Sequence, residues 1–152
     1  MKGRNELHLT DAIVRRIVLL VATGHGYIHV CLVAFPPIFP VLNRELGLTY
    51  TELGLLSTGV AFSLGLSQLI VGPLSDRFGR KWLLLGGLLL FSVATGVCGL
   101  VSTFWPLLFF QVLGGIGGSV MHPVALALVT DVTSTRHRGK SMAVHGAGSM
   151  LG

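Results

Sequence analysis

Charged residues are scarce in this sequence. They make up only 11% of the chain, against 51% hydrophobic residues and a mean hydropathy of +0.77. Soluble domains carry roughly 25% charged residues, so a soluble globular domain is excluded, and the high hydrophobicity excludes a disordered chain. The two cysteines, Cys31 and Cys98, both fall in apolar stretches. There a packing role is favoured over a disulfide or a metal pair. The composition indicates a membrane protein.

Long stretches without Asp, Glu, Lys or Arg give the number of membrane spans. They cover Ile17–Asn43, Leu53–Ser75 and Trp82–Thr130, and a further one opens at Ser141. A span needs roughly 20 residues, so the 49-residue third stretch predicts two spans with a turn at Ser102–Pro106. We expect an all-α membrane protein with spans at about 14–42, 53–75, 82–101, 106–130 and, incomplete, 141–152.

Basic residues are distributed unevenly between the two sides of these spans. Ten of the eleven Lys and Arg residues fall before the first uncharged stretch or in the loops after spans two and four, and only Arg44 falls on the other side. This is the positive-inside pattern. It predicts a cytoplasmic N-terminal segment over residues 1–12, and it explains the net charge of +5 without a nucleic-acid partner.

Glycines are unusually frequent inside the predicted spans, where they let helix backbones approach closely. We expect six of them to lie at helix–helix contacts: Gly114, Gly115, Gly117, Gly118, Gly148 and Gly152. Contacts lined by glycine can also slide and rock, as a transporter requires, and the sequence alone does not separate the two roles.

The most specific motif is the short charged loop between spans two and three, Gly72-Pro73-Leu74-Ser75-Asp76-Arg77-Phe78-Gly79-Arg80-Lys81. We expect Gly72 to permit a close helix crossing and Gly79 to adopt a positive φ. The pattern G-x-L-x-D-R-x-G-R-K resembles the signature loop between helices two and three of the major facilitator superfamily.

That resemblance implies twelve helices in two six-helix halves, with alternating access around a midplane site. Residues 13–152 would then form an incomplete N-terminal half, completed by further C-terminal helices of the same protein. It also implies that the loop is a conformational latch against the second half, favouring the outward-open state, with contributions from Gly72, Asp76, Arg77, Gly79, Arg80 and Lys81.

Two further stretches resemble the branch of this superfamily that contains the fosmidomycin-resistance proteins, which are drug exporters. They are Gly24-His25 in span one and Gly117–Pro123 in span four. The stretch from His145 onward resembles the start of helix five in many exporters. Gln111 stands where many proton-coupled exporters carry an arginine, and His29 stands where this branch often has an acidic residue.

Polar side chains inside spans are costly and are functional candidates by default. His25 and His29 are four residues apart and share a helix face, and the resemblance implies that spans one and four line the cavity. We therefore expect His25, His29, Gln111 and His122 to contact substrate or protons. Alternatively, the histidines are neutral and only hydrogen-bond neighbouring helices. The His25–His29 pair supplies only two ligands, so no metal site is predicted.

The sequence has no phosphate-binding lysine loop, C-x-x-C pair or nucleophile elbow, so no enzyme and no cofactor are predicted. The expected function is proton-coupled export of a small solute, an antibiotic or a small anionic metabolite. The alternatives are transport of iron or an iron chelate by the same fold, and a small membrane subunit that transports nothing. The expected location is a bacterial cytoplasmic (inner) membrane or an internal membrane derived from it.

Overall fold

The computed structural model describes residues 11–150, and within them every regular element is a helix. The first is α1 (Asp11–Ala34), followed by the 3₁₀ turn η1 (Pro36–Ile38) and by α2 (Phe39–Leu46). The buried residues of α1 recur every three or four positions, which gives the helix one face toward the core: Val18, Val21, Ala22, His25 and Ile28. Chain direction changes at Gly47, where φ is 66°.

Helix α3 (Tyr50–Phe78) begins with a capping box, in which the Thr49 hydroxyl accepts from the Glu52 amide at 3.2 Å and the Glu52 carboxylate accepts from the Thr49 amide at 2.8 Å. One residue, Gly79, separates it from α4 (Arg80–Cys98). Gly79 has a φ of 87°, as the sequence predicts for so short a turn, and only glycine adopts that conformation without strain.

The fourth span is broken in the middle. It consists of α5 (Phe104–Gly118), the 3₁₀ turn η2 (Ser119–Met121) and α6 (Pro123–Val132). Pro123 has no amide hydrogen, so it cannot continue the α-helical ladder, and the tighter turn precedes it. A loop then leads to α7 (Arg138–Met150).

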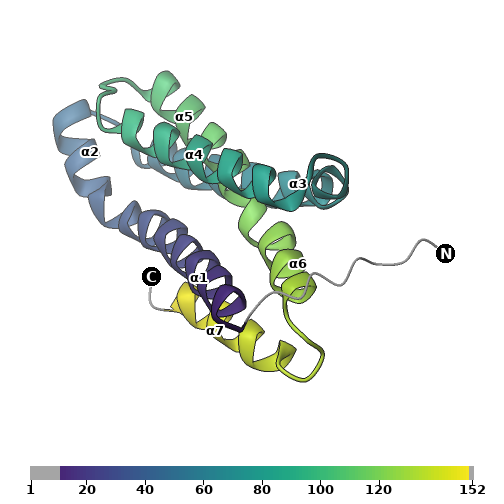
Figure 1. The fold of residues 1–152 in the computed structure, drawn as a ribbon. Coiled ribbons are helices and arrows are strands. Elements are labelled where there is room, and N and C mark those ends of the chain that lie inside the picture. Colours follow the sequence, from purple (N-terminus) through teal and green to yellow (C-terminus); the bar gives the residue numbers. More distant parts are fainter. Residues whose placement is uncertain (1–10, 151–152) are drawn as a thin grey trace.

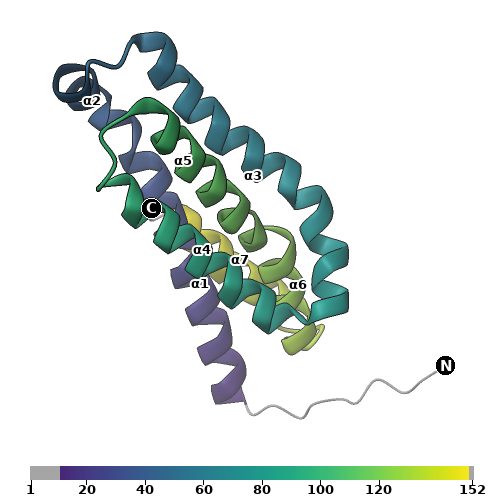
Figure 2. The ribbon, with the colours of Figure 1, turned by 90° about the horizontal axis from the view of Figure 1, so that it is seen from above.

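The helices form two groups joined by the broken span. In one group, helix α5 packs between α3 and α4 (Figure 2). In the other, α7 lies along α1 (Figure 1), and α6 contacts helices of both groups. The main core lies where these groups meet, with Ile28, Phe91, Val120, Val124 and Val129 buried together. A second apolar cluster, around Leu53 and Leu107, joins α3 to α5 near their other ends.

Four helical stretches of the described chain are long and apolar enough to cross a membrane: Asp11–Leu46, Tyr50–Phe78, Arg80–Cys98 and Phe104–Val132. With α7 as the start of a fifth, they confirm the predicted all-α membrane fold. The turn between spans three and four was expected at Ser102–Pro106, but α5 already begins at Phe104. Pro106 fits there because amides in the first helical turn have no partner to lose.

Candidate functional site

A pocket of about 400 Å³ opens between α1, α3, α4 and the broken fourth span. Apolar side chains form most of its wall, among them Leu64, Phe91 and Met121. Six polar side chains also line it: His25, His29, Ser57, Thr95, Gln111 and His122. Four of these are the residues that the sequence singled out, and the fold brings them to one pocket from three helical segments.

Three imidazoles meet in this pocket and form what we call the histidine cluster: His25, His29 and His122. The ring centroid of His25 lies 4.8 Å from that of His29 and 5.0 Å from that of His122. One turn of α1 places the first two on the same face, and the break before Pro123 brings the third against them. His25 is buried, whereas His122 is open to the pocket.

A fourth histidine, His145 of α7, was not among the predicted site residues. Its ring stacks on that of His25, with centroids 4.5 Å apart and planes inclined by 19°. Both side chains are only 5% exposed. The signal that could have found His145 is the one that found the others, a histidine in a stretch without charged residues.

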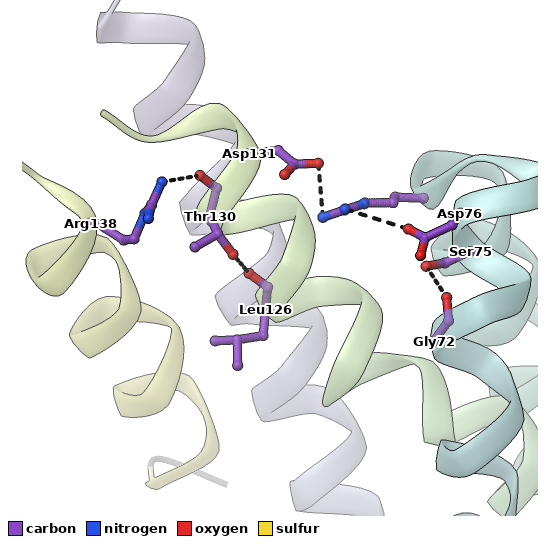
Figure 3. A network of polar contacts seen from close by, with 8 residues as sticks. Gly72, Ser75, Asp76, Leu126, Thr130, Asp131 and Arg138 are labelled. Carbon is purple, nitrogen blue, oxygen red and sulfur yellow. Dashed lines mark hydrogen bonds and ion pairs between the residues drawn. The ribbon is translucent and has the colours of Figure 1, made fainter. Parts of the chain in front are cut away.

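The charged turn after α3 lies at the opposite pole from the α1–α3 loop. Arg80 of α4 forms an ion pair with Asp131 of α6 at 2.8 Å and a longer one with Asp76 of α3 at 3.6 Å. Figure 3 shows Asp131 and Asp76 on either side of the same guanidinium group. The Asp76 side chain is 72% exposed and that of Arg80 only 26%. Arg80 thus links α4 to α3 and α6, while most of the Asp76 side chain stays accessible.

Other residues of the motif make local contacts. Arg77 lies over the Phe78 ring and Lys81 over the Trp82 ring, at 5.7 and 5.2 Å from the ring centroids. A Cβ at Gly72 would meet no atom of residues 11–150 within 4 Å. The close crossing expected at Gly72 is therefore not made by this part of the chain.

The glycines predicted to mediate packing differ in how tightly they are enclosed. A Cβ at Gly117 would lie 2.5 Å from the Phe91 amide nitrogen, one at Gly115 2.5 Å from the Val60 carbonyl oxygen, and one at Gly148 would overlap the Ala22 carbonyl. Gly118 is confined by the Phe91 ring at 3.2 Å, whereas a Cβ at Gly114 would meet its neighbours at an ordinary 3.8 Å. Gly152 lies outside the described residues.

These features define an integral, multi-pass membrane protein with a partly polar pocket among its spans and a charged turn at one pole. The family model described as "Major Facilitator Superfamily" matches residues 19–152. The chain therefore belongs to this superfamily, as its loop motif indicated.

Curated relatives include drug-resistance and transport proteins. The chain is 33% identical over 124 residues to the "Quinolone resistance protein NorA" of Staphylococcus aureus (strain MRSA252), covering 76% of this chain and 31% of that protein. It is 29% identical over 131 residues to a "Putative metabolite transport protein" of Haemophilus influenzae, covering 86% and 32%. The chain thus spans about a third of the length of these relatives.

Proposed function

We propose that the full-length protein is a secondary transporter that exports a small solute in exchange for protons, by alternating access. The observation that carries this proposal is the pocket itself. Its polar side chains come from the middle of apolar spans, where an unused polar group would be costly, and they converge on a space large enough for a small molecule.

The residues proposed to contact the solute are His25, His29, Gln111 and His122, which all line the pocket. Gln111 offers both an amide donor and a carbonyl acceptor, so it suits a polar solute of either kind. Proton coupling is proposed from the resemblance to proton-coupled exporters. A role of these four residues in proton transfer remains a prediction.

An antibiotic or a small anionic metabolite is the proposed class of solute. One similar protein is named for quinolone resistance and another for metabolite transport. Within residues 11–150 no carboxylate lines the pocket, so the described part of the site offers nothing to balance an organic cation. The imidazoles and the Gln111 amide can donate hydrogen bonds to an anionic or zwitterionic solute.

The orientation and the latch are also part of the proposal. The basic residues favour a cytoplasmic N-terminus and a cytoplasmic Arg80–Asp131 pole. In that orientation the pocket opens between the middle of the membrane and the outer side, because it reaches Phe35 and Pro36 at the far end of α1. The exposed Asp76 is then available to contact the remaining helices of the superfamily fold.

The test uses everted membrane vesicles that contain the full-length gene product. An imposed pH gradient, acid inside, should drive accumulation of a quinolone above that in vesicles without the protein, and nigericin should abolish it. Gln111→Ala should weaken accumulation without lowering the amount of inserted protein. Equal quinolone accumulation with and without the protein would refute quinolone export, and a matched screen of small anionic metabolites with no gradient-driven flux would refute the function.

A further inference from the structure

The histidine cluster has the composition of a metal site. The ligand atoms of His25, His29 and His122 all lie within 4.8 Å of one another. Nitrogen ligands about 2.0 Å from a tetrahedral zinc ion are separated by about 3.3 Å. The rings therefore need to close by at most about 1.5 Å, which small side-chain rotations supply. The pair predicted from the sequence offered two ligands, and the fold adds the third.

The imidazoles do not satisfy one another. Within residues 11–150 no hydrogen bond joins two rings of the cluster, and the buried Nε2 of His25 has no hydrogen-bond partner at all. Leaving a buried polar atom unpaired destabilises the folded protein. The free nitrogen of His25 is therefore available to a ligand, and it lies in the same cluster as the imidazoles of His29 and His122.

His145 holds the His25 ring in an orientation and tautomer suited to metal binding. Nδ1 of His25 faces the backbone carbonyl oxygen of His145 at 3.4 Å. A carbonyl can only accept, so Nδ1 carries the proton and Nε2 keeps its lone pair. Metal-binding histidines commonly donate their second nitrogen in this way, which fixes both the tautomer and the ring orientation. The stacked His145 ring further limits rotation of His25.

From this arrangement we infer that His25, His29 and His122 bind a divalent transition-metal ion at the wall of the pocket, with His145 as a positioning residue. Imidazole suits Zn²⁺, Co²⁺, Ni²⁺, Cu²⁺ and Fe²⁺, whereas Mg²⁺ and Ca²⁺ prefer oxygen ligands. Three protein ligands leave a fourth position directed at the pocket. Because the ligands are neutral and the described lining holds no carboxylate, that position suits an anionic donor.

The test is a Co²⁺ titration of the purified full-length protein in detergent, followed by its visible ligand-field spectrum. Wild type should bind one Co²⁺ with bands typical of nitrogen coordination, Zn²⁺ should displace it, and Mg²⁺ should not. His29→Ala and His122→Ala should each raise the Kd for Co²⁺ by at least about tenfold. His145→Ala keeps the backbone carbonyl that His25 faces and removes only the stacked ring, so it should alter the spectrum and raise the Kd by less than either of these variants.

His137→Ala is the matched control, because His137 lies in the exposed loop before α7, outside the cluster. Its Kd should equal that of wild type. The inference is overturned if wild type binds no Co²⁺, or if a folded His29→Ala/His122→Ala double variant binds it unchanged. Binding is measured without any transported solute, so a failure of solute export leaves this result unaffected, and the reverse also holds.

Discussion

Arg80 and Asp131 form the shortest ion pair in the described part of the chain, at 2.8 Å. Arg80 opens α4 directly after the charged turn, and Asp131 lies in the last turn of α6, 51 positions further along the sequence. The pair joins the α3–α4 group to the end of the broken span. It therefore fixes the geometry of the pole from which Asp76 projects.

We predict that Asp131→Asn lowers the free energy of unfolding more than Asp76→Asn does. Asp131 makes the closer contact with Arg80 and is the less exposed of the two carboxylates, 55% against 72%. Exposed pairs contribute about 0–1 kcal/mol, so the difference in free energy of unfolding should be small but directional. Thermal unfolding of both variants in detergent measures it. A larger loss for Asp76→Asn would contradict the assignment of Asp131 as the main partner.

For transport we predict the opposite order, with a larger loss of flux in Asp76→Asn than in Asp131→Asn. If Asp76 contacts the second half in the outward-open state, that contact is worth about 1–3 kcal/mol, and a loss of 2 kcal/mol shifts the equilibrium toward inward-open about thirtyfold. Asp76→Asn should then transport poorly while it still inserts and binds solute. Flux normalised to inserted protein checks this. Normal flux would leave the turn as a topological anchor only.

Close packing between α1 and α7 leads to a prediction at Gly148. A Cβ there would overlap the Ala22 carbonyl, whereas one at Gly146 in the same helix meets no described atom within 4 Å. Gly148→Ala should destabilise the protein by about 1–3 kcal/mol through overpacking, and Gly146→Ala should not. Thermal unfolding of the two variants compares them. Equal stabilities would show that α1 and α7 separate more easily than the contact indicates.

Topology is tested with single cysteines introduced at Asn43 and Ser134, after replacement of Cys31 and Cys98. The positive-inside pattern predicts that an impermeant thiol reagent labels the Asn43 position in intact cells and the Ser134 position only in everted vesicles. The reverse pattern of labelling would invert the orientation proposed for the chain.

Much of the fold could be predicted because membrane spans leave a strong signal. In lipid every backbone amide must be satisfied within the segment, so a long stretch without charges indicates a helix. The same signal misplaces helix ends, since helices continue past the last apolar residue. Helix α1 begins at Asp11 rather than at about residue 14, and α3 runs on to Phe78.

The candidate site was only partly predictable. Each polar residue in a span can be identified from sequence, but whether they meet depends on how the helices cross. The break at Ser119–Met121 brings His122 to the α1 pair, and the Gly148 contact with Ala22 brings His145 onto His25. The pairing of Arg80 with Asp131 likewise depends on packing between α4 and α6, which no local pattern specifies.

Alternating access of the pocket is the central claim, and it can be tested without knowing the solute. Ser57 of α3 lines the pocket, so a single cysteine at this position, in a chain without Cys31 and Cys98, reports on its accessibility. The cysteines at Asn43 and Ser134 serve as controls for each side. An impermeant thiol reagent should modify the Ser57 position both in intact cells and in everted vesicles, and Asp76→Asn should speed the reaction in everted vesicles. Modification from one side only, unchanged by Asp76→Asn, would contradict alternating access.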